Sequence, residues 1–323
     1  MEVGIVIPSF DRYANAGEFR RVVEQLEGLG FDSAWFGDHV TFPAERPEYM
    51  GDSWLDAVAA ANVGLGMTRR LKFGTDVLVA PYRNPLLLAK MAATASVLSD
   101  NRFILGLGIG WLEGEFEVLN APPFASRAEV TEEYLEIIRL AFTQSGEISY
   151  SGKWFAFERA LFEPKPAGTL PILVGGNHEK ALRRAAVYGD GWHPLFLSPE
   201  EYARCRSEIE RIRAGAGITR PFCYSMSGSE CRILPQGNAP ELTKVAQEGT
   251  SYAPAVGTDG EGRQRFIGTA AQVRADCVAL AGAGVDQLVL RFAVPLDPRT
   301  GPEQHFEQVR LFAQEVLPAC QAA

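Results

Sequence analysis

The sequence has few cysteines, and none of them has a spacing that would give it a role. Five cysteines, an odd number, occur in 323 residues, and no two form a C-x-x-C pair. A disulfide-stapled secreted scaffold and the common zinc motifs are therefore excluded. We interpret the cysteines as small core residues, and we predict a reduced, cytoplasmic protein. The cysteines are Cys205, Cys223, Cys231, Cys277 and Cys320.

Long apolar runs and clusters of positive charge are also missing. No run approaches the roughly 18 apolar residues of a membrane span, and the opening MEVGIVIPSF is typical of a strand rather than a signal peptide. The chain has 31 basic and 40 acidic side chains, a net charge of −9, and no more than two basic residues are adjacent. We therefore predict neither a membrane nor a nucleic-acid partner. An anionic ligand would have to be held by backbone amides and a few local cations.

What the sequence does contain is a regular alternation of strands and helices. The predicted strands cover residues 3–10, 32–39, 71–80, 103–110, 171–176, 191–196, 222–234 and 285–294. The predicted helices cover residues 16–31, 52–66, 84–99, 127–142, 179–189, 199–215, 270–284 and 301–317. Nearly all the strands are apolar, as in a parallel sheet buried on both faces. Eight such units predict an α/β fold of the (β/α)₈ TIM-barrel type rather than a doubly wound sheet.

The barrel is expected to form one domain over residues 1–323, with insertions after the fourth and seventh strands. The first insertion contains a short hairpin at 148–157, and the second is a Gly-, Pro- and Ser-rich stretch at about 235–265. Gly30 is predicted to end the first helix. Asp52 or Ser53 is predicted to cap the second helix.

Polar residues at the carboxyl ends of the strands are the candidates for function, because barrel active sites lie there. Asp38 and His39 end an apolar strand, and a neutral histidine is suited to proton exchange near pH 7. The alternative is a capping aspartate beside a surface histidine. Gly175, Gly176 and Asn177 directly precede a helix, where backbone amides favour an anion such as phosphate. An ordinary turn between strand and helix would look the same.

Three alternating glycines, Gly106, Gly108 and Gly110, share one face of the fourth strand. They do not form the G-x-G-x-x-G fingerprint of a dinucleotide site, because Trp111 occupies the position of the third glycine. Two interpretations remain: a tightly packed strand, or a face on which a flat ligand approaches the backbone.

Other catalytic chemistries have little support in the sequence. The four histidines are far apart without an H-x-x-x-H pair, so no metal site is predicted. No lysine ends a predicted strand, which argues against a Schiff-base enzyme, and no G-x-S-x-G motif is present. A barrel mouth with many glycines, several aromatic residues and few acid–base groups favours a bound organic cofactor that carries the chemistry.

Four segments resemble the bacterial-luciferase-like family of flavin- and deazaflavin-dependent oxidoreductases. They are GLGFDSAWFGDHV, GTDVLVAPYRNPLLLAK, NRFILGLGIGWLEGEF and PILVGGNHEKALRRAAVYGDGW. The resemblance implies a TIM barrel with coenzyme F-420, a deazaflavin, or FMN at its mouth.

The resemblance also implies roles for individual residues. Asp38 and His39 would lie beside the cofactor ring, and a cis peptide between Asp76 and Val77 would support its back face. The loop Gly175, Gly176 and Asn177 would receive the cofactor phosphate. Space for the ring would be cleared by Gly108 and Gly110.

The reaction is less closely defined by the resemblance than the fold. Trp111 stands where the sugar-phosphate dehydrogenases of the family have a glutamate, their proton donor. We therefore predict His39 and Asp38 as the catalytic residues, with His39 as the main acid–base candidate. The implied activities are hydride transfer with F-420 or monooxygenation with FMN on a small organic substrate. A reduced deazaflavin reacts poorly with O₂, and we favour F-420. The alternative is a non-catalytic flavin-binding barrel. We also expect a homodimer.

Overall fold

The structure is a computed structural model that describes residues 1–45, 51, 53–234, 259, 262–292 and 301–323. The predicted insertion at 235–265 therefore lies almost wholly outside the described residues, and the assignment of the chain to one domain stays a prediction. Among the described residues, no helix combines the length and apolar character that crossing a membrane requires.

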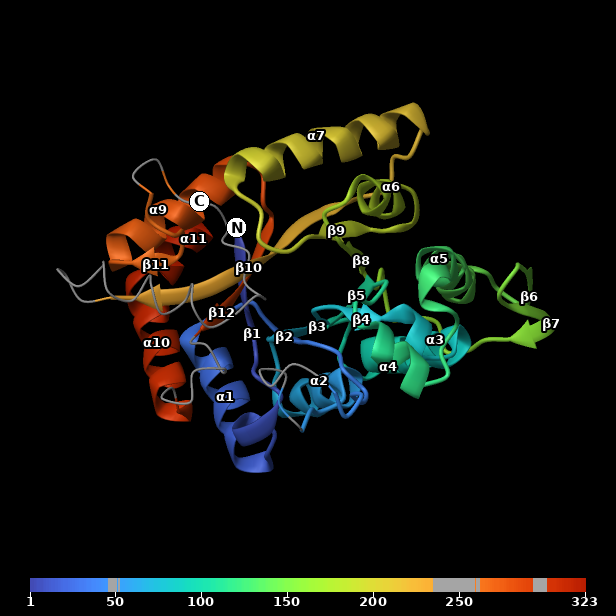
Figure 1. Cartoon of the computed structure of the whole chain (residues 1–323), viewed down its shortest axis with the longest axis horizontal. Helices are drawn as coiled ribbons and strands as arrows, with labels where there is room; N and C mark the ends of the chain where they lie inside the picture. The colour runs from blue at the N-terminus through green and yellow to red at the C-terminus, as the bar shows by residue number, and fades with distance from the viewer. Residues whose placement is uncertain (46–50, 52, 235–258, 260–261, 293–300) are drawn as a thin grey trace.

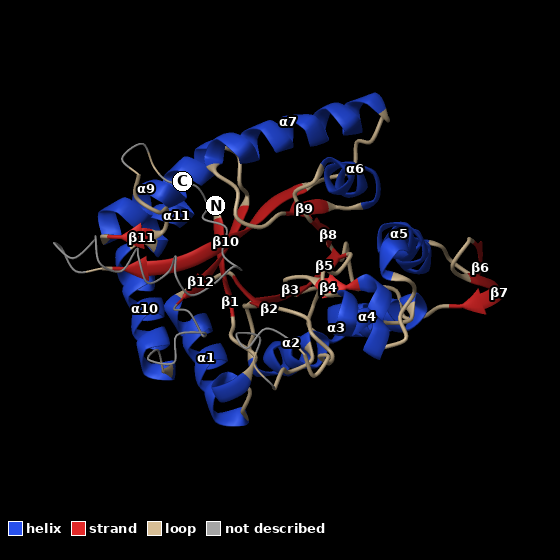
Figure 2. Cartoon of the chain, viewed as in Figure 1, coloured by secondary structure: helices blue, strands red, loops and turns tan. Residues whose placement is uncertain are grey.

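Eight parallel strands close into a barrel at the centre of the molecule (Figure 2). In order around the barrel they are β1 (Glu2–Val6), β2 (Ser33–Phe36), β3 (Lys72–Thr75), β5 (Phe103–Gly108), β8 (Ile172–Gly175), β9 (Gly191–His193), β10 (Cys223–Ile233) and β12 (Gln287–Phe292). Pairing of β12 with β1 closes the ring; for example, Val3 lies opposite Leu288. The TIM-barrel prediction is confirmed.

Helices surround the barrel on its outside (Figure 1). The eight predicted helices are present as α1 (Ala16–Leu29), α2 (Ala57–Met67), α3 (Pro85–Leu98), α5 (Arg127–Thr143), α6 (Glu179–Tyr188), α7 (Pro199–Gly215), α9 (Ala270–Gly282) and α10 (Pro302–Glu315). The chain adds the short helices α4 (Glu113–Val118) and α11 (Leu317–Ala322), and the 3₁₀ turns η1 (Asp11–Tyr13), η3 (Ala80–Tyr82) and η4 (Phe124–Ser126).

The elements outside the eight-strand ring are small. The predicted hairpin consists of β6 (Glu147–Ser151) and β7 (Ala156–Leu161), which lie beyond α5 at the edge of the molecule (Figure 1). The predicted third strand is split into β3 and the short β4 (Leu78–Val79), and the peptide bond between Asp76 and Val77 in the break is cis, as the resemblance implied. A last short strand, β11 (Ile267–Gly268), pairs with β10.

Of the two predicted helix caps, one is confirmed and one is wrong. Gly30 ends α1 in the left-handed conformation, with φ of 88°. The cap of α2 is Asp56, whose side chain accepts a hydrogen bond from the amide of Ala59 at 2.8 Å. Ser53 is too far upstream, because the chain around Trp54 is held extended by a β-bridge to Phe10, and Asp52 lies outside the described residues.

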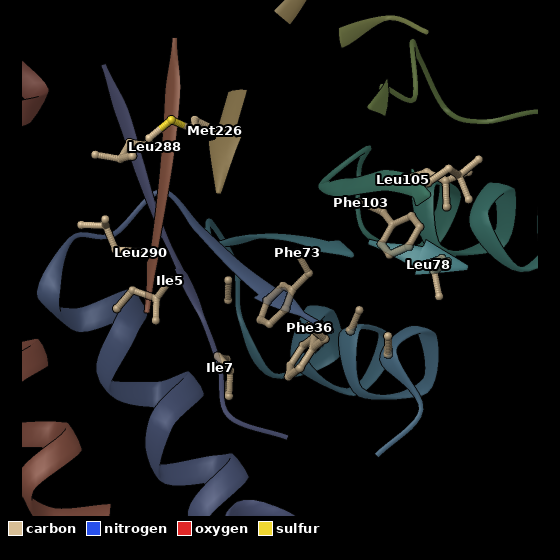
Figure 3. Close-up of a cluster of buried hydrophobic side chains, with 14 of the residues drawn as sticks. Ile5, Ile7, Phe36, Phe73, Leu78, Phe103, Leu105, Met226, Leu288 and Leu290 are labelled. Atoms are coloured by element: carbon tan, nitrogen blue, oxygen red, sulfur yellow. The ribbon is translucent and has the colours of Figure 1, made fainter. Parts of the chain in front are cut away.

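The core has two layers, one outside the strands and one inside the barrel. Between strands and helices, Phe36 and Phe73 stack at 6.3 Å beside α2 (Figure 3). Inside the barrel, fully buried Trp35 is the largest member of a cluster with Ile104, Leu173 and Val289. A Cβ on Gly74 would lie 2.4 Å from the Trp35 ring, so this position has room only for glycine. Trp35 thus closes the barrel beneath its mouth.

Candidate active site

A cavity of about 390 Å³ opens at the carboxyl ends of the barrel strands. This volume is in the usual range for small-molecule sites, and its walls are mainly apolar. The predicted site residues that line it are Asp38, His39, Asp76, Val77, Gly108, Gly110, Gly175 and Gly176; Asn177 does not line it. The structure therefore brings together side chains from segments more than 100 residues apart.

His39 lies at one side of the cavity, paired with a buried glutamate. Its Nδ1 is 2.8 Å from Oε2 of Glu115 on α4, and Glu115 has no exposed surface. Because an ionised carboxylate only accepts hydrogen bonds, Nδ1 carries the hydrogen. The other ring nitrogen, Nε2, has no partner among the described residues. The carboxylate fixes the orientation of the ring and stabilises the imidazolium that would form on proton uptake.

The Glu115 carboxylate is itself held from three further directions. Its Oε1 accepts hydrogen bonds from the amides of Val40 at 2.7 Å and Thr41 at 3.2 Å. The Tyr82 hydroxyl donates to Oε2 at 3.1 Å. Burial, together with the charge of Glu115, raises the pKa of Tyr82 above its usual range, so the phenol stays protonated and remains a donor. His39 is therefore anchored through Glu115 to the loop after β2 and to η3.

Asp38, the neighbour of His39, is committed to an ion pair. Arg83 donates to both of its carboxylate oxygens, at 2.6 and 2.7 Å, and the amide of Val79 donates at 2.9 Å. Arg83 also pairs with Asp56 at the start of α2. Every oxygen of Asp38 is thus occupied by groups that hold β4 and α2 in place. This arrangement is suited to a positioning role for Asp38, and the predicted catalytic role of Asp38 stays a prediction.

The cavity is also lined by a third buried carboxylate, Asp76. It accepts a hydrogen bond from Nε2 of His193 at 2.8 Å and forms an ion pair with Arg291. Burial opposes ionisation, but the Arg291 charge and the His193 hydrogen bond outweigh it, so the pKa of Asp76 is held below its usual value. Nδ1 of His193 contacts the Ser225 hydroxyl at 2.7 Å, and its ring stacks on Trp35. The floor of the cavity is therefore rigid and electrostatically balanced.

The glycine face of β5 makes room for protein rather than for an open space. A Cβ on Gly106 would lie 1.9 Å from the carbonyl oxygen of Thr75, and a Cβ on Gly108 would lie 2.5 Å from the Val77 side chain. At Gly110 the conflicting groups are Val79 and Phe116. These glycines allow the segment after β3 to approach β5. Gly108 and Gly110 also line the cavity, and their place beside a cofactor ring stays a prediction.

The glycine pair after β8 borders the cavity as predicted. Gly176 has φ of 110°, and a Cβ there would lie 2.8 Å from Cβ of Ala181 in α6. Asn177 turns away, because its side chain both donates to and accepts from the backbone of Leu195, at 2.6 and 3.0 Å. The side chain of Asn177 therefore holds the turn, and any phosphate would meet backbone at Gly175 and Gly176.

Sequence reasoning missed several residues of this site. Glu115 and Arg83 carry no local signal, because their partners lie 76 and 45 positions away. Ser9 follows β1, and its hydroxyl is buried at the cavity and has no partner among the described residues. No group of three potential metal ligands occurs in the described part of the chain.

The chain is similar in sequence to a known protein family and to a curated enzyme. A sequence model of the family described as luciferase-like monooxygenase matches residues 1–229. The phthiodiolone/phenolphthiodiolone dimycocerosates ketoreductase of Mycobacterium tuberculosis (strain ATCC 25618 / H37Rv) is 30% identical over 254 residues, covering 72% of this chain and 65% of the relative.

Two solved structures have the same fold at low sequence identity. An F420-dependent secondary alcohol dehydrogenase in complex with an F420-acetone adduct is 18% identical, with a TM-score of 0.76 and coverage of 99% of this chain and 98% of the other. Monooxygenase RslO1 from Streptomyces bottropensis is 23% identical, with a TM-score of 0.79 and full coverage of both chains, 100% each.

Proposed function

The chain belongs to the luciferase-like monooxygenase family and shares its barrel fold and oxidoreductase class, and on this premise we propose that it transfers a hydride between coenzyme F-420 and a small organic carbonyl or alcohol. The observation that carries the proposal is the His39–Glu115 pair at the edge of an apolar cavity. Reduction of a carbonyl requires a proton on oxygen in step with hydride on carbon. An imidazole oriented by a buried carboxylate is suited to supply it.

The cavity fits a planar ring cofactor with a phosphate tail. Ser9 offers a buried hydroxyl that has no partner among the described residues, at a wall that a ring would cover. Val77, half-buried on the cis peptide, provides an apolar support for a ring face. Gly176 leaves the backbone open to a phosphate at the start of α6. Under this proposal Ser9 and Val77 hold the ring, and the Gly175–Gly176 turn holds the phosphate.

The bound cofactor would supply the hydride donor or acceptor, and the chain would supply binding, orientation and the proton. His39 holds that proton at Nε2, with Glu115 fixing the ring through Nδ1. Monooxygenation with FMN is the second candidate, supported by the likeness of fold to a monooxygenase. The ketoreductase relative and the intact acid–base pair favour hydride transfer. The same pair gives no support to a non-catalytic flavin-binding protein.

Cofactor titration separates these functions. The purified protein is titrated with F-420 and with FMN, and binding is followed by cofactor fluorescence. We expect F-420 to bind at least tenfold more tightly, and reduced F-420 to be oxidised on addition of a ketone in a single turnover. Tighter binding of FMN with substrate-dependent O₂ uptake would establish the second candidate instead. Binding of neither cofactor would reject both.

We propose that the protein is a homodimer formed through α2 and α3. These helices leave large apolar side chains in solvent, among them Leu98 at 80%, Leu87 at 57% and Val63 at 54% exposure. A second copy would cover this surface. Light scattering after size exclusion should give twice the chain mass, and Leu98→Glu should yield monomers. Leu161→Glu, at an equally exposed leucine on the hairpin, is the matched control and should remain dimeric.

A cytoplasmic location is also proposed. All five cysteines are free thiols, and four of them are buried. Free thiols are typical of a reducing compartment.

A further inference from the structure

We infer that the substrate is a neutral ketone or secondary alcohol carrying a flat apolar group, such as a phenyl ring, next to the reacting carbon. This inference rests on the proposed function, because it assigns the substrate of the same cavity. Two independent features of the cavity carry it: aromatic side chains surround His39, and the lining charges are already paired.

Aromatic rings surround the imidazole of His39 on several sides. Trp54 meets it edge to face at 4.8 Å, Phe42 lies at 4.8 Å, and Trp111 meets it at 6.2 Å and 88°. Phe10 stacks on Trp54 at 4.5 Å, which fixes that indole. A substrate oxygen placed at Nε2 of His39 therefore brings the adjacent substituent against indole and phenyl surfaces. Such surfaces favour a flat ring, through stacked or edge-to-face contact, over a polar or branched group.

The second feature is the charge balance of the lining. Among the described lining residues, the ionised side chains are Asp38, Asp76 and Arg291. Asp38 is neutralised by Arg83 and Asp76 by Arg291, whose guanidinium also donates to Ser227 and to the carbonyl of Gly228. Among the lining residues that the structure describes, no cation is left over for an anionic substrate, and burying an unpaired charge is strongly unfavourable. Phosphorylated and carboxylated substrates are therefore disfavoured.

Trp111 extends this selection to the cavity entrance. Its side chain is 43% exposed, so it lies where a substrate enters. An indole at this position presents an apolar surface to the substrate, whereas a carboxylate would present a charge. Trp111 is therefore the residue of the aromatic wall that can be altered with the least effect on folding.

Calorimetric titration tests the inference with two matched ligands. These are acetophenone and 4-acetylbenzoate, which differ only in a ring carboxylate. The protein is first saturated with whichever of F-420 and FMN binds, and is used alone if neither does. We expect the neutral ketone to bind at least fivefold more tightly than the benzoate. We expect Trp111→Ala to weaken binding of the neutral ketone at least threefold, and Leu161→Ala on the hairpin to leave it unchanged.

The outcomes separate this inference from the proposed function. A smaller preference, a tighter benzoate, no measurable binding of the ketone, or an effect of Trp111→Ala below threefold would overturn the substrate assignment, even with F-420 bound. Preference for the neutral ketone in a protein that binds neither cofactor would leave the substrate assignment standing and reject both hydride transfer with F-420 and monooxygenation with FMN. Circular dichroism of Trp111→Ala confirms that the variant is folded.

Discussion

His39 directs one ring nitrogen to Glu115, and its other ring nitrogen has no partner among the described residues. Under the proposed function, removal of His39 should therefore affect turnover rather than binding. General acid–base catalysis contributes about 10²- to 10⁴-fold in rate. We expect His39→Ala to lower single-turnover oxidation of reduced cofactor by that order, with the cofactor dissociation constant within about threefold of the parent. Stopped-flow kinetics and a cofactor titration measure the two quantities. Turnover within threefold of the parent, with binding intact, would exclude His39 as the acid.

Under the proposed function Glu115 would act on the substrate only through His39, so a variant of Glu115 needs a matched control. We expect Glu115→Gln to lower turnover about tenfold or more, because the amide replaces the charge that stabilises an imidazolium. Tyr82→Phe removes a different hydrogen bond to the same carboxylate and should leave turnover within about threefold. If both variants lose turnover equally while their melting temperatures fall together, Glu115 has only a structural role.

At the residue scale, the sequence identified one half of this pair. His39 stands out because it ends an apolar strand, where strand geometry alone places it at the barrel mouth. Glu115 is one of several acidic residues in a short helix, and nothing local marks it as the buried one. Its role depends on the path of the loop after β5, which brings α4 under His39, and that path is a tertiary feature. Asp38 adjoins His39 in the sequence, but its charge is neutralised by Arg83. The sequence gives no sign of this partner, which lies 45 positions away.

At the scale of a single turn, Gly176 tests the proposed phosphate site. Its φ of 110° and the 2.8 Å approach to Ala181 leave no space for a side chain. We expect Gly176→Leu to weaken cofactor binding at least tenfold, about 1.4 kcal/mol. Gly146→Leu is the matched control, because Gly146 also has a positive φ, of 77°, but its Cβ would meet nothing within 4 Å. Equal cofactor affinity in the two folded variants would show that the phosphate does not bind at Gly176.

Most helices and strands were predictable from the sequence. Where an observed element differs from the predicted one, the difference is local. The eight helices follow from apolar periodicity and caps such as Gly30. The predicted strand 71–80 is broken at Asp76 and Val77, and an apolar run gives no sign of that break. The sequence shows that the glycines of β5 share one face of the strand. It does not show which residues fill the space beside that face. Only the structure places Thr75 and Val77 against Gly106 and Gly108.

For the whole molecule, strict alternation of strands and helices was sufficient to predict the barrel. Ring closure is a consequence of eight parallel units and of the pairing of β12 with β1. The interior filling was not predictable, because Trp35 and the glycine opposite it, Gly74, lie on different strands. Charge pairing across the cavity, such as Asp76 with Arg291, likewise joins positions 215 residues apart.

Acid stability of the whole fold should depend on a single histidine outside the site. His305 on α10 is fully buried against Tyr13 and Phe306, and neither ring nitrogen has a partner among the described residues. Burial lowers its pKa from 6.5 to about 4. The unfolded chain therefore binds a proton on this ring more readily than the folded protein does. Stability is full above about pH 6.5 and falls as the pH drops toward 4.

Protonation of His305 in the unfolded chain should lower the free energy of unfolding by about 2 kcal/mol between pH 7 and pH 5. We expect His305→Leu to remove most of that loss, measured by urea denaturation at the two pH values. His178→Asn, at an exposed histidine before α6, should keep the parental loss. Asp76, with its lowered pKa, also contributes acid sensitivity, but its contribution is lost only near and below the ordinary aspartate pKa of about 3.9. A parental loss of stability in His305→Leu would therefore assign the sensitivity to groups other than His305 and Asp76.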